Sequence, residues 1–283
     1  MMVNSAALLI DCPDRKGLVA SVSSLLYRHG ANITHADQHQ DHEAGLFFMR
    51  VEWTLEGFEL ETFRREFVPM ATELNMRWRL EHLAECPRVA IFVSQYLHCL
   101  VDLLHRQQLG ELRCKVPLIV SNHQDGEALA RFYGVDFRYM PMTRENKAHA
   151  EEEQLRLLEE QQIDVVVLAR YMQILSPRFV QQYPSRIINV HHSFLPAFIG
   201  ARPYHAAFAR GVKLIGATSH YVTEVLDDGP IIEQDVARIS HRDQVEDLIQ
   251  KGRDLERMVL SRAVGWHLEH RILRYGNKTV IFD

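Results

Sequence analysis

The spacing of apolar residues in the first eighty or so positions changes repeatedly between two patterns. Residues 6–11 form a short apolar run typical of a buried strand, whereas residues 18–27 carry apolar side chains at helical spacing. The later segments alternate in the same way, with strand patterns at 32–39, 46–53 and 76–83 and a helical pattern at 59–75. The resulting order, β-α-β-β-α-β, is the ferredoxin-like arrangement.

The pattern changes around Cys86 and Pro87. Continuous apolar runs at 88–94, 116–122 and 164–170 now alternate with helical stretches. Such runs are expected of strands covered on both faces, and the alternation predicts a parallel sheet with right-handed crossovers. We therefore predict an α/β chain with two domains. Residues 1–86 form a ferredoxin-like α+β domain, and residues 87–283 form a Rossmann-like, mostly parallel domain that ends in a short hairpin.

Composition narrows the function classes. Apolar residues make up 47% of the 283 positions and charged residues 24%, the balance of a globular protein. The net charge is -5 and basic residues are scattered, so we expect no nucleic-acid partner. The chain lacks a signal-peptide pattern and any apolar stretch near the roughly 20 residues of a membrane helix, so we expect a cytoplasmic protein. The four cysteines have neither zinc-site nor C-x-x-C spacing and are expected to be reduced.

Three polar residues suggest chemistry in the second domain. Asn189 and His191 are two positions apart on a predicted strand, so their side chains share a face at its C-terminal end, where open α/β sheets bind ligands. Asp227 lies in a turn after the apolar segment 216–222. An amide can stabilise an oxyanion, an imidazole can move a proton, and a carboxylate can order a water or hold the imidazole. No serine or cysteine lies in a nucleophile elbow, which favours attack by an external nucleophile.

Each of these residues also has a structural explanation. An asparagine at a strand end often closes a turn, a single histidine is often a hydrogen-bond partner, and residues 227–230 suit a plain turn. The adjacent His191 and His192 could suggest a metal, but neighbouring strand residues point to opposite faces and no further ligand completes a set. We therefore predict no metal site.

Two segments carry a resemblance to a known family. INVHHSFLPAF, followed by HYVTEVLDDGP, resembles the N-x-H…LP and H-x-V-x-x-x-x-D-x-GP elements of the folate-dependent formyltransferases. The resemblance implies catalytic places for Asn189, His191 and Asp227 and a supporting one for His220. The run LARYMQILSP is similar to the pteridine-binding loop, which implies a folate pocket. Its expected lining comprises Leu168, Gln173, Ile174, Leu175, Ile187 and Val222. The folate would be the formyl-donating substrate, with no separate cofactor.

The first domain resembles an ACT domain. Its CPDRKG turn is similar to the effector loop of such domains, which implies that Asp14 and Gly17 bind an amino-acid effector, glycine or methionine. Effector sites of ACT domains often lie where two domains pair, which implies a homo-oligomer, a dimer or tetramer. The alternative is that this domain supports assembly only, because regulation requires two states that the effector binds unequally.

The combination resembles the hydrolytic subgroup of the formyltransferases, which SFLPAFIGARPYH also matches. Residues 94–99 (SQYLHC) lack the glycine-rich turn that would cradle a phosphorylated acceptor, and the chain adds no basic nucleic-acid-binding domain. Water is therefore the expected acceptor. The expected reaction hydrolyses 10-formyltetrahydrofolate to formate and tetrahydrofolate, supplying formate for purine synthesis and balancing the one-carbon folate pool. A transferase acting on a small amine and a folate sensor without turnover remain as alternatives.

Overall fold

The computed structural model describes residues 4–195 and 203–282, and the chain divides into two compact units. The first unit comprises Met1–Glu85 with Glu269–Tyr275 and Thr279–Asp283. The second comprises Cys86–Leu268 with Gly276–Lys278. The division in the middle of the chain lies beside the predicted boundary at 86/87. The C-terminal strands, however, belong with the first unit rather than with a domain that runs from 87 to 283.

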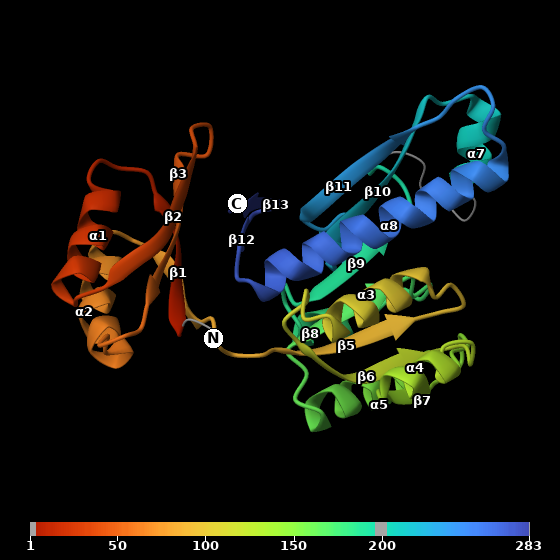
Figure 1. The fold of residues 1–283 in the computed structure, drawn as a ribbon, viewed down its shortest axis with the longest axis horizontal. Helices are drawn as coiled ribbons and strands as arrows, with labels where there is room; N and C mark the ends of the chain where they lie inside the picture. Colours follow the sequence, from red (N-terminus) through yellow and green to blue (C-terminus); the bar gives the residue numbers. More distant parts are fainter. Residues whose placement is uncertain (1–3, 196–202, 283) are drawn as a thin grey trace. The chain divides into compact units, whose positions relative to one another are not determined.

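The first unit is a four-stranded antiparallel sheet in the order β2-β3-β1-β4 with two helices on one side (Figure 1). Its elements are β1 (Ser5–Pro13), α1 (Leu18–Arg28), β2 (Asn32–Asp41), β3 (Leu46–Thr54), α2 (Leu60–Glu73) and β4 (Arg77–His82). The predicted ferredoxin-like order is confirmed.

Both faces of this sheet are covered, and β1 serves both because successive side chains of a strand point to opposite faces. Ala6, Leu8 and Ile10 belong to the cluster that contains the buried side chains of α1 and α2. Ala7 and Leu9 belong to a second cluster, which includes Phe48, Leu273, Val280 and Phe282. The last three side chains lie at or next to β12 (Ile272–Tyr275) and β13 (Lys278–Ile281). This packing explains why the C-terminal hairpin belongs to the first unit.

The second unit is built on a seven-stranded sheet in the order β11-β10-β9-β8-β5-β6-β7. Its elements are β5 (Arg88–Val93), α3 (His98–Gln108), β6 (Lys115–Ser121), α4 (Glu127–Tyr133), β7 (Asp136–Tyr139), α5 (Lys147–Glu160), β8 (Val165–Ala169), α6 (Pro177–Gln182), β9 (Ile187–His191), α7 (Pro203–Arg210), β10 (Leu214–Tyr221), β11 (Ile231–Arg238) and α8 (Val245–Leu268). β9, β8, β5, β6 and β7 pair in parallel, while β10 pairs antiparallel with β9 on one side and with β11 on the other. The predicted Rossmann-like, mostly parallel sheet is confirmed.

The strand order has a switch point between β5 and β8, where ligand sites of such sheets are expected. The chain builds β5, β6 and β7 outward in one direction and then returns through α5 to add β8 on the other side of β5. Open α/β sheets bind ligands at such a switch point, outside the carboxyl ends of the strands. In Figure 1, α3 and α8 lie on one face of the sheet and α5 on the other.

Residues 231–268 carry no predicted element, yet they form β11 and the long helix α8. α8 packs on β9, β10, β11 and α3 through apolar residues that include Leu248, Leu255 and Val259. None of the helices in the described part of the chain has the length and apolar character needed to cross a membrane.

Candidate active site

A cavity of about 320 Å³ lies at the C-terminal ends of β8 and β9. Nine residues singled out from the sequence line it: Leu168, Gln173, Ile174, Leu175, Asn189, His191, His220, Val222 and Asp227. Ile187 does not line it. This side chain is fully buried in the core cluster that also contains Leu168 and Leu175, so the expectation that Ile187 walls the pocket is corrected. Ile187 supports the cavity from the core.

The register between β9 and β10 brings two of the polar residues together. These strands are antiparallel, with Asn189 opposite His220 and His191 opposite Thr218. Directly opposite residues of an antiparallel pair have neighbouring side chains. The Ser219 hydroxyl also donates to the Asn189 carbonyl at 3.0 Å, which fixes the strand at this point.

A tight turn after β10 adds the carboxylate of Asp227. Asp227 has a φ of 56°, in the left-handed region that is uncommon for residues other than glycine. Two residues later the turn passes so close to β10 that a Cβ on Gly229 would lie 1.7 Å from the Tyr221 carbonyl oxygen. Only glycine fits there. The backbone N–H of Tyr221 donates to the Pro230 carbonyl at 2.9 Å, so strand and turn are fixed to each other.

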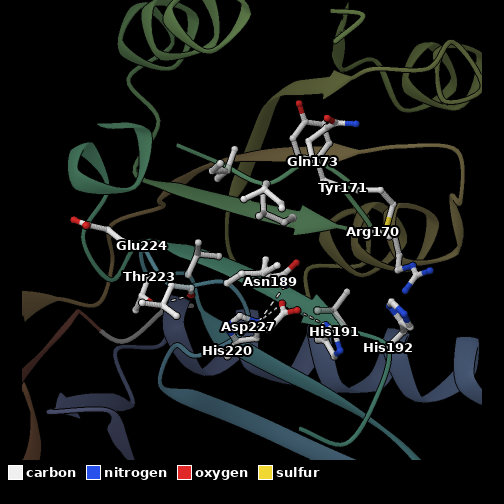
Figure 2. Close-up of a pocket in the computed structure, with 18 residues that line it drawn as sticks. Arg170, Tyr171, Gln173, Asn189, His191, His192, His220, Thr223, Glu224 and Asp227 are labelled. Atoms are coloured by element: carbon white, nitrogen blue, oxygen red, sulfur yellow. Dashed lines mark hydrogen bonds and ion pairs between the residues drawn. The ribbon is translucent and has the colours of Figure 1, made fainter. Parts of the chain in front are cut away.

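Hydrogen bonds among the four polar residues define their protonation. His220 Nδ1 lies 3.0 Å from the Tyr221 carbonyl oxygen, an acceptor, so Nδ1 carries a proton. In neutral His220, Nε2 then accepts from the Asn189 side-chain amide, whose Nδ2 is 3.2 Å away. His191 Nδ1 lies 3.2 Å from Asp227 Oδ2, and His220 Nε2 lies 3.8 Å from Asp227 Oδ1. Figure 2 shows the four side chains converging at one end of the cavity.

Two pKa shifts agree with this assignment. Burial lowers the pKa of His220 below its ordinary value, which keeps the ring neutral. The hydrogen bond from His191 lowers the pKa of Asp227 and outweighs burial, which alone would raise it. The site therefore holds one neutral imidazole, one anionic carboxylate and a second imidazole between that carboxylate and the cavity.

His191 and His192 do not point to opposite faces, contrary to the sequence expectation. Their rings stack with centroids 4.9 Å apart and an interplanar angle of 21°, and both residues line the cavity. The alternation rule fails because β9 ends at His191, and His192 already belongs to the loop. Among the described residues, His191 Nε2 is buried without a hydrogen-bond partner, so it is available to a ligand.

Hydrogen bonds hold the loop that forms the opposite wall of the cavity. The Met172 amide donates to Ser94 Oγ at 3.0 Å, and the Ser176 amide donates to the buried Glu151 carboxylate at 3.0 Å. Four apolar side chains at the cavity are more than half exposed: Met172, Ile174, Val225 and Leu226. Such a rim suits a large, flat, partly apolar ligand.

Sequence reasoning missed a charged network beside the cavity. Arg170, at the end of β8, lines the cavity and lies 3.5 Å from the buried Glu256 carboxylate of α8. Glu256 also accepts from Tyr204 and His98, each at 2.7 Å. Residues from four separate elements meet here, and no local spacing in the sequence indicates that they contact one another.

His98, Cys99 and Glu256 also place three potential metal-ligand atoms within 4.8 Å of one another. Glu256, however, already has hydrogen bonds and a neighbouring guanidinium, a positive charge that opposes a second cation. Burial also raises the pKa of Cys99, which favours the thiol over the metal-binding thiolate. We assign His98 and Glu256 to the charged network, and Cys99 is a buried thiol beside it.

In the first unit, the predicted effector residues Asp14 and Gly17 line a depression of about 500 Å³ together with Leu18, Gln38, Gln40 and others. Gly17 precedes α1 with a φ of 92°, which glycine adopts without strain. Residues 196–202, part of the SFLPAFIGARPYH motif, lie outside the described residues.

Comparisons with known proteins agree with both halves of this description. Residues 87–264 match the formyl transferase family, and residues 6–60 match the ACT domain. The chain is 55% identical to formyltetrahydrofolate deformylase of Synechocystis sp. over 98% of each chain. It is 50% identical to that of Bacillus subtilis, over 98% of this chain and 93% of the relative.

A solved structure agrees as well. The crystal structure of a formyltetrahydrofolate deformylase from Pseudomonas syringae superposes with a TM-score of 0.96 at 49% identity, over 100% of this chain and 96% of the other. Sequence and fold thus match along both units. The chain belongs to the formyltetrahydrofolate deformylase family, in which an ACT domain precedes a formyl transferase domain.

Proposed function

We propose that the cavity hydrolyses 10-formyltetrahydrofolate to formate and tetrahydrofolate, with water as the acceptor. The observation that carries the proposal is the convergence of an amide, an unpartnered imidazole nitrogen and an anionic carboxylate at one end of a partly apolar cavity. The name of the relatives, formyltetrahydrofolate deformylase, supports the same substrate here.

Binding uses the apolar rim and the loop. The pterin lies against the backbone near Gln173 and Leu175, with Leu168, Ile174 and Val222 around it. This placement brings the formyl group toward Asn189 and His191. In this proposal the folate is consumed as substrate, and side chains and water do the remaining chemistry without a cofactor.

Two donors stabilise the oxyanion. One N–H of the Asn189 amide is held by His220, and the other meets the formyl oxygen. His191, supported by Asp227 at Nδ1, donates from Nε2 as imidazolium. One such donor contributes about 3 to 4 kcal/mol of transition-state stabilisation. His220 acts as a positioning residue because it orients Asn189.

Asp227 orders the attacking water. Its low pKa keeps it anionic, so it holds the water strongly, and it accepts the proton as attack on the formyl carbon makes that water acidic. The water oxygen bonds to the formyl carbon, the carbon–nitrogen bond breaks, and the folate nitrogen takes a proton. The products are tetrahydrofolate and formate, with one net proton released.

The test is formate release from 10-formyltetrahydrofolate by the purified protein without any amine. Release should fall roughly 10²- to 10⁴-fold in Asp227→Asn, while folate affinity stays nearly intact. The matched control is Asp228→Asn, the same change in the next, exposed residue. Near-normal release in Asp227→Asn would contradict the proposal that Asp227 orders the attacking water and accepts its proton. Release that requires an added amine would instead identify a transferase.

For the first unit, we propose that an amino acid, glycine or methionine, binds at Asp14 and Gly17 and alters turnover. The depression beside these residues supports it.

We also propose a homo-oligomer, a dimer or tetramer, in which copies pair through this unit. β2 is an edge strand, and its unpaired backbone groups can pair with another chain. Mass measured in solution tests the oligomer, and turnover measured with and without the amino acid tests the effector.

The setting of the reaction is part of the proposal. We place it in the cytoplasm, and the four free cysteines suit a reducing compartment. The formate released would serve purine synthesis, and the tetrahydrofolate would return to the one-carbon pool.

A further inference from the structure

Arg170 is held in an unfavourable backbone conformation at the edge of the catalytic cavity. It follows the last residue of β8 and has a φ of 61°, a left-handed conformation that is unfavourable for a residue with a side chain. Its carbonyl accepts from the Ser94 amide at 3.3 Å, which fixes the backbone. Strain of this kind persists where the structure needs the side chain in one place.

The guanidinium of Arg170 is anchored on one side only. The Glu256 carboxylate lies 3.5 Å from Nε, and the Tyr96 ring lies 5.7 Å from Cζ. Burial alone would raise the pKa of Glu256, but the hydrogen bond from His98 and the charge of Arg170 lower it, so the carboxylate stays ionised. Glu256 is therefore a positioning residue for the guanidinium.

The other side of the guanidinium has unused donors. The Arg170 side chain is only 10% exposed. Among the described residues, Nη1 is buried without a hydrogen-bond partner. Nε also lacks a partner with hydrogen-bond geometry, but it faces the Glu256 carboxylate and belongs to the anchored side. A buried donor left unsatisfied is costly, more so when it is charged. Figure 2 shows the guanidinium beside His192, toward the end of the cavity where His191 lies. An anionic oxygen at this end would satisfy it.

We propose that Arg170 binds the formate product and draws it away from His191 after the carbon–nitrogen bond breaks. The inference rests on the proposed hydrolysis, which converts a neutral formyl group into a carboxylate anion at this end of the cavity. Before the reaction the formyl group carries no charge and gains little from the guanidinium. Afterwards two carboxylate oxygens can accept charge-assisted hydrogen bonds from it.

The chemistry favours formate over the other carboxylates in the system. Those of the folate substrate lie in its glutamate tail, at the far end of the molecule from the pterin. With the formyl carbon at Asn189 and His191, the carboxylate formed nearest to Arg170 is formate itself.

The first experiment measures formate as an inhibitor of 10-formyltetrahydrofolate hydrolysis. We expect the formate inhibition constant to rise by about tenfold or more in Arg170→Gln, since a hydrogen bond to a charged group is lost. Arg170→Lys, which keeps the charge without the fork of donors, should fall between. The control is Arg253→Gln. Arg253 also lies 5.7 Å from the Tyr96 ring, but it is exposed and does not line the cavity.

A second experiment measures formate binding to the wild-type protein itself and uses a variant only to assign the signals. Titrating wild-type protein with formate, in the presence of tetrahydrofolate, should shift the ¹⁵N–¹H signals of the Arg170 guanidinium. The signals are assigned by their loss in Arg170→Lys. Absence of any shift would overturn the inference. So would an unchanged formate inhibition constant in a folded Arg170→Gln with a raised KM for the folate, which would place a folate carboxylate on Arg170. Failure of the wild type to release formate without an amine would defeat the proposed function instead.

Discussion

The cavity of the second unit and the depression of the first differ in how far their polar groups are arranged before a ligand arrives. At the cavity, His191 and His220 are 7% and 2% exposed, and hydrogen bonds link them to Asp227 and Asn189. At the depression, Asp14, Gly17 and Gln40 are exposed, and a hydrogen bond from Gln40 to the Asp14 carboxylate joins two of them. The polar groups of the cavity are therefore preorganised, whereas those of the depression are hydrated until a ligand displaces the water.

Backbone strain separates the two regions in the same way. At the cavity, Arg170 and Asp227 have side chains and yet adopt positive φ angles. At the depression the corresponding conformation belongs to Gly17, which carries no penalty. A reaction needs donors and carboxylate at fixed distances, and strain is acceptable for that purpose. An effector site only needs to favour one state over another. Substitutions that disturb geometry should therefore harm the cavity most.

Among substitutions outside the polar residues of the active site, the largest effect is expected for Gly229→Ala. The new Cβ would overlap the Tyr221 carbonyl oxygen, so the turn must move and carry Asp227 with it. A displacement of about 1 Å can lower kcat about 10²-fold, and we expect a loss of that order with the protein still folded. Gly265→Ala is the control, because its Cβ would meet only Leu112 Cδ2 at an ordinary 3.6 Å. A kcat within about threefold of wild type in Gly229→Ala would mean that the turn is adaptable after all.

The next effect concerns pH and stability. His220 has a lowered pKa in the folded protein. As the pH falls below the ordinary value of about 6.5, this histidine therefore takes up a proton in the unfolded chain but not yet in the folded one. The free energy of unfolding should then drop by up to about 1.4 kcal/mol per pH unit from this group, until the pH reaches the folded pKa. Above about pH 6.5 this contribution is constant.

His220→Gln tests the origin of that slope. A glutamine oxygen can accept from Asn189 but does not titrate, so the slope measured by urea unfolding between pH 6.5 and 5 should flatten. His270, in the first unit, also has a pKa lowered by burial, so His270→Gln reports the contribution of that unit separately. An equal slope in wild type and His220→Gln would contradict the assignment of His220 as a buried neutral ring.

The two regions also differ in how much of them the sequence predicts. Most strands and helices of both units follow from periodicity, because buried faces repeat every two or about 3.6 residues, but β11 and α8 were not predicted. Asn189 and His191 could be paired from their spacing alone. The neighbourhood of Asn189 and His220 depends on the antiparallel register of β9 and β10, and only the family resemblance indicated it.

Local sequence patterns do not predict interactions between elements that are distant in the sequence. Arg170 and Glu256 come from the end of β8 and from α8, and neither sits in a motif that signals the other. The stacking of His191 on His192 depends on where β9 ends, and strand boundaries are the part of a prediction that periodicity fixes least. The position of the C-terminal hairpin was also not predicted. Both faces of β1 are apolar, and the sequence does not show that the hairpin side chains cover one of them.

A smaller effect is expected at the depression from Gly17→Val. A Cβ at this position meets nothing within 4 Å, so the penalty comes from the φ of 92° alone. The turn before α1 should change shape, and the response of turnover to glycine or methionine should be lost. Gly30→Val is a matched control, since Gly30 also has a positive φ and open space but does not line the depression. Each variant is compared with its own activity without amino acid. No response in wild type either would favour a domain that serves assembly only.

The smallest effect is expected from Asp14→Asn. Asparagine keeps the shape and can still accept from Gln40, so what is lost is the charge that would attract the ammonium group of an amino acid. An exposed ion pair contributes about 0.2 to 1 kcal/mol, so the half-maximal concentration of the amino acid should rise by up to about fivefold. Asp37→Asn, on the same strand as Gln40 but not among the residues that line the depression, should leave it unchanged. Salt sharpens the result, because screening should weaken effector binding in wild type and have little effect in Asp14→Asn. Equal salt dependence in the two proteins would show that Asp14 contributes shape rather than charge, and the depression would then resemble the preorganised cavity more closely than its exposure indicates.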